Sequence, residues 1–488
     1  MLYSLDEIIA NGEAYFFYKK EDVKNKEYKI SLVYDKLDKD TIYIPVKVIC
    51  SFKLSDDFVL YLENAIKNKK IRGFVFDEIR YSDEQYRNLL FKIIEKYKDD
   101  IDFILMTDDT EKMAERLCYY TRVAKFSDKM RLLAVTGSVG KTTTTEMLCS
   151  VLKQKFKIYR GAATVNMKIK ILNKFFEADS DTDFLVLETA MQRKGYLKFY
   201  SELYNADGII ITNATTENIK DFGSTDNIAK EKSTLSSYLN EKAVVVAENN
   251  PSFEYHLRKT KAKKILLDKN GYELISADKN GSKFNYKNFE YEIPVVGLHQ
   301  ITNAIKAIEL LLQLGFEPSF IKSGLQELEA VGDRWVVDKY EGGIEFITDC
   351  PNNPSVETML ANIETFLNLY KDEKIKRVAI SRIKFLGDLE EKFYLKIAKF
   401  LAKSDLNEVI VLDIEAKSIY EYLKNNSDIK TTFFEKPESL TKDTPFVKYL
   451  IDTLNEKQAF LLKAQRDDYG IKFGQVKEIL RKELKFMG

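Results

Sequence analysis

The stretch RLLAVTGSVGKTTTTEM, residues 131–147, constrains the fold of this chain more than any other segment. An apolar run, LLAV, is followed by small residues and then by a segment with helical character, which predicts a strand, a tight loop and a helix. Such a loop directs backbone N–H groups and the positive end of the helix dipole toward an anion. The segment therefore predicts a phosphate-binding loop. The alternative is a strand–turn–helix that uses Gly and Thr only as caps.

The glycine spacing of this loop differs from the commonest phosphate loop, G-x-x-x-x-G-K-[ST]. That pattern would need glycine at position 135, where the chain has Val135, and the observed pattern is T-G-S-x-G-K-T-T. The lysine would supply a point charge to the β- and γ-phosphates, and the hydroxyl after it would reach Mg²⁺. The nucleotide-binding residues expected from the loop are Gly137, Ser138, Gly140, Lys141, Thr142 and Thr143.

Alternating apolar and amphipathic segments predict an α/β fold of three domains. Residues 1–127 mix short β-rich runs with helical stretches, and residues 128–330 form a central P-loop domain with a mainly parallel sheet. Two DKNG tetrapeptides, at 268–271 and 278–281, favour hairpin turns and predict a small antiparallel excursion there. Residues 331–488 repeat the alternation and predict a Rossmann-like C-terminal domain, with strands at EFIT, RVAIS, EVIVLD, TTFF and FLLKA.

Composition excludes several classes of function. Lys+Arg and Asp+Glu both number 76, so the chain lacks the basic excess of a dedicated nucleic-acid surface. The two histidines give little material for a histidine-rich metal site, and the four cysteines form no CxxC pair. No apolar run approaches the length of a membrane span, and the N-terminus lacks the apolar core of a signal peptide. We therefore expect a cytoplasmic protein with no membrane or nucleic-acid partner, and its oligomeric state stays open.

The short loop resembles that of the Mur ligases, a family that forms amide bonds with ATP. The resemblance runs nearly from end to end and is strongest to the branch that adds D-alanyl-D-alanine to a peptidoglycan precursor. It implies that ATP phosphorylates a substrate carboxylate, that an amine attacks the acyl phosphate, and that ADP is released. ATP and Mg²⁺ are the implied cofactors, and a small-molecule acid and amine are the implied partners. A UDP-N-acetylmuramoyl peptide is one candidate acid.

The resemblance also assigns a metal-binding role to two residues beyond the loop. Glu188, which ends the apolar run FLVLE, falls at the family's metal-binding acid. Lys232 falls at a lysine that CO₂ carbamylates, and a carbamate offers the oxygen ligands that Mg²⁺ prefers. From the residues alone, Glu188 could equally be a solvated acid at the end of a strand. Without the resemblance, Lys232 would be interpreted as a solvated charge on a helix.

Four further residues match family positions that contact the nucleotide. His299 and Asn303 lie in GLHQITNA, which resembles the helix that meets adenine. Arg334 matches an interdomain arginine that touches the γ-phosphate, and a guanidinium suits a transferring phosphoryl group. Asp349 matches an acid that contacts the ribose. The catalytic residues that the resemblance implies are Lys141, Glu188, Lys232 and Arg334.

The chain departs from the family at several substrate-contacting positions. Asn218 replaces a histidine that helps to bind the second Mg²⁺, so the implied metal ligands are Thr142, Glu188, Lys232 and Asn218. The sugar-peptide segment at 164–172 keeps only Asn166, and 35-DKL-37 lacks the serine and arginine of the uridine-contacting D-S-R. Ser381 and Arg382 replace a Gly-Asp pair in the amine-binding region. Because these side chains would form hydrogen bonds with a polar substrate, their replacement indicates that the substrate differs as well.

Three functional interpretations follow. The first is an ATP-dependent, ADP-forming carboxylate–amine ligase, either a peptidoglycan enzyme or a paralogue that joins an amino acid or peptide to a different acid. The second is a nucleotide-binding module without catalytic activity, which Asn218 favours and the retained Lys141, Thr142, Glu188 and Lys232 disfavour. The third, a kinase or other P-loop phosphotransferase, fits the three-domain pattern least well.

Overall fold

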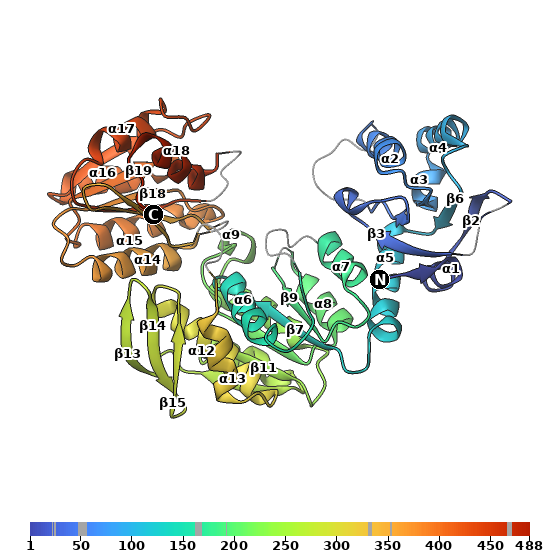
Figure 1. The fold of residues 1–488 in the computed structure, drawn as a ribbon, viewed down its shortest axis with the longest axis horizontal. Helices are drawn as coiled ribbons and strands as arrows, with labels where there is room; N and C mark the ends of the chain where they lie inside the picture. Colours follow the sequence, from blue (N-terminus) through green and yellow to red (C-terminus); the bar gives the residue numbers. More distant parts are fainter. Residues whose placement is uncertain are drawn as a thin grey trace. The chain divides into compact units, whose positions relative to one another are not determined.

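β-Sheets covered by helices form the described part of the chain in the computed structural model (Figure 1). The structure describes residues 1–21, 23, 26–46, 56–161, 168–191, 193–329, 334–351, 354–465 and 471–488. These residues pack into two compact units. The first comprises Met1–Ala134 with Lys155–Asp207, and the second comprises Val135–Gln154 with Gly208–Gly488.

The N-terminal part of the first unit is a six-stranded mixed sheet with strand order β1-β3-β4-β5-β6-β2. Its strands are β1(Tyr3–Ser4), β2(Ala14–Lys19), β3(Glu27–Ser31), β4(Thr41–Tyr43), β5(Gly73–Asp77) and β6(Phe103–Thr107). Its helices are α1(Leu5–Gly12), α2(Asp56–Lys69), α3(Glu78–Ser82), α4(Glu84–Tyr97) and α5(Thr110–Tyr120). Alternate side chains of β5 and β6, including Phe74, Phe76 and Ile104, pack with α2 and α4 in one apolar core. Short strands and helices thus alternate in this region, as the sequence predicted.

The strand that precedes the phosphate loop belongs to a second six-stranded sheet, with order β12-β11-β10-β7-β9-β8. The strands are β7(Arg131–Thr136), β8(Ile158–Arg160), β9(Phe184–Glu188), β10(Gly208–Ile211), β11(Val244–Glu248) and β12(Lys263–Leu267). Four consecutive residues of β7, Leu132 to Val135, have no exposed surface, as expected of a strand covered on both faces. Pairing of β10 with β11, β11 with β12 and β8 with β9 is parallel, which confirms the predicted parallel sheet.

Helices flank these strands in sequence, as the βαβ rhythm predicts. Those of the first unit are α7(Lys168–Glu177) and α8(Tyr196–Tyr204). Those of the second are α6(Lys141–Leu152), α9(Ile219–Phe222), α10(Thr225–Ser233), α11(Pro251–His256), α12(Leu298–Gln313) and α13(Pro318–Gln326). Both α12 and α13 pack against α6, the helix that follows the phosphate loop. Residues far along the chain thereby come close to the loop.

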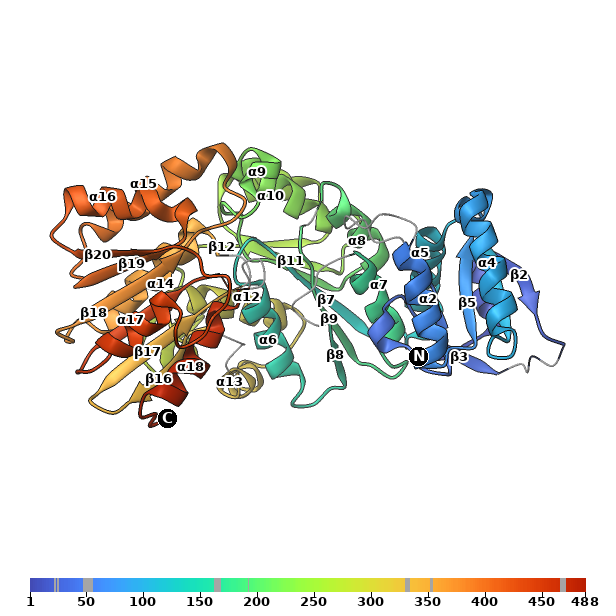
Figure 2. The same ribbon diagram turned by 90° about the horizontal axis from the view of Figure 1, so that it is seen from above.

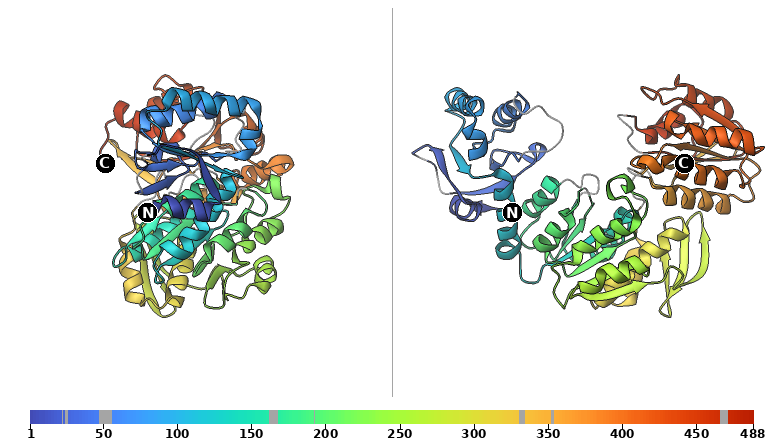
Figure 3. Two further views of the ribbon diagram at one scale, coloured as in Figure 1. Left: turned by 90° about the vertical axis from the view of Figure 1, so that its right-hand side faces the viewer. Right: turned by 180° about the vertical axis from the view of Figure 1, so that it is seen from behind.

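A small antiparallel sheet, β13-β14-β15, lies in the region where the DKNG tetrapeptides predicted one. Its strands are β13(Glu273–Asp278), β14(Gly281–Tyr286) and β15(Phe289–Ile293), drawn in yellow-green in Figure 1 and in the right panel of Figure 3. The second tetrapeptide forms the first hairpin turn, because Asp278 pairs with Gly281. Gly281 has a φ of 141°, and a Cβ there would lie 2.1 Å from the carbonyl oxygen of Ile293. Only glycine fits this turn.

The C-terminal sheet has six strands in the order β16-β17-β21-β18-β19-β20, and all pairs are parallel except β16 with β17. The strands are β16(Val336–Tyr340), β17(Ile344–Asp349), β18(Lys376–Ser381), β19(Glu408–Leu412), β20(Lys430–Phe434) and β21(Ala459–Lys463). Five of them coincide with the predicted strands, and β16 was not predicted. The last strand, β21, inserts between β17 and β18, so the sheet contains a crossover.

Successive side chains of these strands point to opposite faces of the sheet, so each face has its own apolar core. On one face, Val378, Ile380 and Val409 pack with α14(Val356–Leu369), α15(Glu390–Leu401) and α16(Lys417–Asn426). On the other, Ala379 and Ile410 pack with α17(Pro445–Thr453) and α18(Val476–Glu483). Figure 2 shows α15 and α16 on one side of β19 and α17 and α18 on the other. The predicted α/β class is confirmed for this sheet as well.

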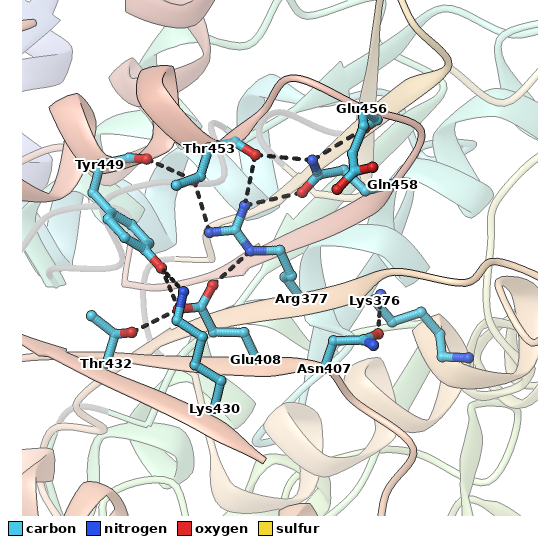
Figure 4. Close-up of polar contacts among 10 residues, drawn as sticks. All are labelled: Lys376, Arg377, Asn407, Glu408, Lys430, Thr432, Tyr449, Thr453, Glu456 and Gln458. Atoms are coloured by element: carbon cyan, nitrogen blue, oxygen red, sulfur yellow. Dashed lines mark hydrogen bonds and ion pairs between the residues drawn. The ribbon is translucent and has the colours of Figure 1, made fainter.

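A buried ion pair crosses the amino end of this sheet (Figure 4). Arg377 and Glu408 are register partners on β18 and β19, and Nε of Arg377 donates to Oε2 of Glu408 at 2.7 Å. The same guanidinium donates to Gln458 and Thr453, each at 3.0 Å. Burial raises the pKa of Glu408, but hydrogen bonds from Thr432 and Tyr449, together with the charges of Arg377 and Lys430, outweigh it and leave that pKa below its ordinary value.

We predict that Arg377→Met lowers the free energy of unfolding by about 3 kcal/mol at pH 7, because it leaves a buried carboxylate without its main cation. Urea unfolding followed by circular dichroism measures the loss. The double variant Arg377→Met/Glu408→Gln removes the stranded charge and should recover part of the stability. A single variant as stable as the wild type would contradict the prediction.

Candidate functional site

The phosphate loop adopts a conformation that only glycine permits at two positions. Strand β7 ends at Thr136, helix α6 begins at Lys141, and Gly137 and Gly140 have φ angles of 144° and 84°. A Cβ on Gly137 would lie 1.8 Å from Oγ1 of Thr212. No side chain caps the start of α6, so its first-turn amides face the loop without a side-chain acceptor. This arrangement is a ready anion site.

Lys141 folds back over the loop that precedes it. Its Nζ donates to the carbonyl oxygens of Gly137 and Ser138 at 2.8 Å and 2.7 Å. The same nitrogen lies 3.3 Å from Oε2 of Glu217. The ammonium group is thus held at the loop, as the sequence predicted, and its carboxylate partner was not foreseen.

A second loop, which follows β10, fixes the shape of the phosphate loop. The backbone N–H of Val139 donates to Oδ1 of Asn213 at 3.0 Å, and Oγ1 of Thr212 donates to the carbonyl of Val139 at 2.5 Å. The N–H of Thr215 donates to Oγ of Ser138 at 3.0 Å. Sequence reasoning gave Thr212 and Asn213 no role, although the dipeptide directly after the apolar run GIII was a usable signal.

Arg334 reaches the first turn of α6 although it lies nearly two hundred residues further along the chain. One terminal nitrogen donates to Oγ1 of Thr143 and the other to Oγ1 of Thr142, both at 3.1 Å. A guanidinium offers this fork of donors to phosphoryl oxygens as readily as to hydroxyls. The structure therefore brings together Arg334, Lys141, Thr142 and Thr143, as the sequence predicted.

Lys232 on α10 is buried, with 1% of its surface exposed. Burial lowers its pKa to about 7; the negative charges of Glu217 and Glu231 oppose this effect, and the positive charge of Lys141 adds to it. An amine must be neutral to react with CO₂, and this environment favours the neutral form. The side chain is therefore suited to carbamylation, in contrast to the solvated lysine that the residues alone suggested.

Glu188 ends β9 in the first unit and is also buried. Its Oε2 has no hydrogen-bond partner among the described residues. Burial lowers the pKa of Lys174, in the same unit, to about 8, and the negative charge of Glu188 opposes this. A buried carboxylate oxygen without a donor is costly unless a cation or proton binds it.

The residues expected to meet adenine lie at the start of α12. Oδ1 of Asn303 lies 2.5 Å from where a Cβ on Gly140 would be, so its amide packs directly on the phosphate loop. Burial lowers the pKa of His299 to about 4, helped by the charges of Lys463 and Arg334 and opposed by Asp349. His299 is therefore neutral at pH 7, and its Nδ1 has no hydrogen-bond partner in the part of the chain that the structure describes.

Asp349, the expected ribose contact, is buried and paired. It is the register partner of Lys463 across β17 and β21, and its Oδ2 accepts from Lys463 and from Asn362. Parallel strands bring their carboxyl ends to one edge, which explains why this acid meets the lysine of the FLLKA strand. A ribose would meet a carboxylate that already has two donors.

Asn218 and Arg382, which depart from the family pattern, both lie in the described part of the chain. Asn218 has a left-handed backbone, with φ of 61°, and its side chain does not cap α9. Arg382 pairs with Glu415 and lies 3.5 Å from Oδ2 of Asp413. Asn166 lies outside the described residues, as does the rest of 162–167.

The donor set fits ATP and a hard cation better than a transition metal. No group of three His, Cys, Asp or Glu side chains that could hold a metal occurs among the described residues. The available donors are instead the Thr142 hydroxyl, carboxylates and a lysine suited to carbamylation, and oxygen donors of this kind suit Mg²⁺. The unpartnered oxygen of Glu188 is consistent with a cation ligand.

Known proteins resemble this chain in sequence and in fold. The family profile for the Mur ligase middle domain matches residues 135–311. UDP-N-acetylmuramoyl-tripeptide--D-alanyl-D-alanine ligase of Bacillus subtilis is 28% identical over 313 residues, which covers 63% of this chain and 67% of that protein.

Two solved structures share the fold. The MurF crystal structure from Acinetobacter baumannii has a TM-score of 0.80 at 18% identity and covers 99% of both chains. MurF from Thermotoga maritima in complex with ADP has a TM-score of 0.72 at 18% identity and covers 93% of this chain and 96% of its own.

No described helix is both long enough and apolar enough to cross a membrane. The matched residues include the phosphate loop, Glu188 and Lys232. The resemblance noted from the sequence is confirmed: the chain contains a Mur ligase middle domain, and its sequence is similar to that of a ligase of this family.

Proposed function

We propose that this ligase joins a carboxylate of a UDP-N-acetylmuramoyl peptide to the amine of D-alanyl-D-alanine or a similar dipeptide, through an acyl phosphate. The observation that carries the proposal is the gathering of Lys141 and Arg334 on the phosphate loop and its two threonines. Two cations at one loop suit the charge that develops on a phosphoryl group in transfer. The names of the matched relatives support this acid and this amine.

The loop residues would divide the work of holding ATP. Gly137, Ser138, Gly140 and Thr143 would present donors to the phosphates, and Lys141 would leave the loop carbonyls to bind the β- and γ-phosphates. Arg334 would turn its fork from the threonine hydroxyls to the γ-phosphate. His299 and Asn303 would contact adenine, and Asp349 would contact the ribose.

Thr142, Glu188, carbamylated Lys232 and Asn218 are the residues that would hold Mg²⁺. The ion would neutralise phosphate charge during transfer. Lys232 is buried with its pKa lowered to about 7, chiefly by that burial, so it holds its neutral amine ready for CO₂. Asn218 would offer a neutral amide oxygen in place of the family's histidine.

We also propose a role for each domain. Residues 1–127 would hold the sugar peptide, residues 128–330 would bind ATP, and residues 331–488 would bind the amine at the carboxyl edge of their sheet, where ligands of open α/β sheets gather. A cytoplasmic location fits Cys118, Cys149 and Cys350, which are buried thiols. The acid and the amine would be the partners of the enzyme.

One observation favours a second candidate, a ligase of the same mechanism with a different acid or amine. Arg382 stands where the family has an acid, and it pairs with Glu415 beside Asp413. In the first unit, the expected uridine-contacting segment forms a short turn at Tyr34–Lys36, and Leu37 after it is buried. Substrate binding distinguishes the two candidates.

We expect release of ADP only when ATP, the UDP-sugar tripeptide and D-alanyl-D-alanine are all present, because the acyl phosphate needs both an acid and an amine. Lys141→Ala should lower this rate at least ~100-fold, since it removes a positive charge from the transition state. Lys153→Ala, which removes an exposed lysine at the other end of α6, is the matched control. A coupled ADP assay measures all three proteins. Turnover without the amine, or equal rates in both variants, would refute the ligase mechanism.

Binding of the UDP-sugar tripeptide should raise the melting temperature, because a ligand that binds only the folded state stabilises it by about 2.7 kcal/mol at one hundred times its dissociation constant. Differential scanning fluorimetry measures the shift, with D-alanyl-D-alanine alone as a comparison. No shift at millimolar tripeptide would instead support the ligase with a different acid.

A carbamate on Lys232 should appear as a ¹³C resonance when the protein is equilibrated with labelled CO₂. Because only the neutral amine reacts and the pKa of Lys232 is about 7, the signal should increase as the pH rises from 6 to 8. Lys232→Met should abolish the signal, whereas Lys230→Met, which alters an exposed lysine of the same helix, should keep it. A signal that survives in Lys232→Met would show that another amine is modified.

A further inference from the structure

We infer that Glu217 is the charged ligand of a divalent cation beside the phosphate loop. The role of the charged ligand would thus belong to the residue that directly precedes Asn218. The inference rests on the proposed ATP-dependent ligation and deepens it. The family resemblance expects a metal-binding imidazole at position 218, whereas this inference assigns the role to the carboxylate of Glu217. The cation class is a hard divalent ion, since such ions prefer oxygen ligands.

The first observation is where the Glu217 carboxylate lies. Its Oε2 is 3.3 Å from Nζ of Lys141, and only 11% of each side chain is exposed. An acid in a solvated loop would extend into water, but this one turns inward to the phosphate-binding lysine. The carboxylate thus stands beside the place where triphosphate would bind.

The second observation is that Glu217 also acts on Lys232. After burial, it is the largest electrostatic influence on that buried amine. Glu217 therefore contacts the lysine expected to bind phosphate and acts electrostatically on the lysine expected to become a metal-binding carbamate. Carbamylation would replace one positive neighbour of Glu217 with a negative one.

The backbone holds Glu217 in this direction. The N–H and hydroxyl of Thr216 both donate to Oε2 of Glu357, at 3.4 Å and 2.8 Å. The N–H of Ile219 donates to the carbonyl of Thr216 at 3.2 Å, which closes a turn around Glu217 and Asn218. The neighbouring Asn218 takes the left-handed conformation at φ 61°.

Charge balance then requires a cation. A bound triphosphate brings several negative charges to a partly buried carboxylate, and like charges repel strongly where water is scarce. A divalent cation between carboxylate and phosphate converts that repulsion into attraction. The neutral amide of Asn218 creates no such requirement and supplies no charge to meet it. The competing interpretation is that Glu217 is only a counter-ion of Lys141 and moves away when ATP binds.

The experiment counts Mn²⁺ ions bound to the full-length protein with a non-hydrolysable ATP analogue, from the electron paramagnetic resonance of free Mn²⁺. The wild type should bind two ions, and Glu217→Gln should lose one or bind it at least ~10-fold more weakly. Glu217→Asp keeps the charge and should retain both. Asp221→Asn removes an exposed acid of the same segment and should match the wild type.

The same titration separates the possible failures. Nucleotide affinity is measured without metal in each variant, and Glu217→Gln should bind the analogue more tightly there, because a negative charge is gone. Unchanged Mn²⁺ stoichiometry and affinity in Glu217→Gln would overturn the inference and leave the proposed function intact. Loss of an ion in Asn218→Ala but not in Glu217→Gln would overturn it in favour of the amide. A wild type that binds no nucleotide would overturn the proposed function, and the inference with it.

Discussion

Concentrated positive charge around one strand–loop–helix turn is the constraint on which the rest of this structure depends. Lys141, Lys232 and Arg334 come from three distant parts of the sequence, and the charge of Lys141 helps burial to depress the pKa of Lys232. In the described residues around the loop, Glu217 is the acid paired with Lys141, and threonine hydroxyls receive Arg334. An arrangement of this kind gains most when a polyanion binds, because the protein dipoles and cations are already oriented. The side chains around the loop are thus arranged to receive an anion.

Much of the fold was predictable because its elements have strong local patterns. The buried runs LLAV, FLVLE and RVAIS all became strands, since continuous apolar segments of this length suit sheets covered on both faces. The DKNG turn between β13 and β14 followed from local turn preference. Strand β16 was missed because its short, half-polar sequence VVDKY has no strict apolar–polar alternation. The segment gains its order from pairing with β17.

The site was predictable only in part, for a related reason. The loop glycines and Lys141 form a contiguous motif, and family register pointed to Lys232 and Arg334. Glu217 and Glu357 carry no local signal, because their roles arise only when the loop after β10 meets the phosphate loop and α14. The burial that makes Lys232 unusual is likewise a tertiary property. Alone, KEKS looks like an ordinary solvated helix segment.

The two halves of the reaction have diverged to different extents in this chain. The groups that would handle ATP remain together, whereas the carboxyl edge of the C-terminal sheet has a different set of charges. There Asp413 takes a strained backbone with φ of 136°, and burial together with Glu415 raises its pKa to about 7 despite the charge of Arg382. Strain and a perturbed acid at a strand end are typical of ligand sites. Both features are explained most simply if the chain activates its acid with ATP as the family does but joins that acid to a different amine.

The most direct test of this account follows oxygen atoms through one turnover. The acid substrate is labelled with ¹⁸O in its reacting carboxylate, and the inorganic phosphate released with ADP is analysed by mass spectrometry. If the carboxylate attacks the γ-phosphate and the amine then displaces phosphate, one ¹⁸O is transferred to each phosphate. Unlabelled phosphate would show that water or another group attacks ATP, and would contradict activation of the acid at this site.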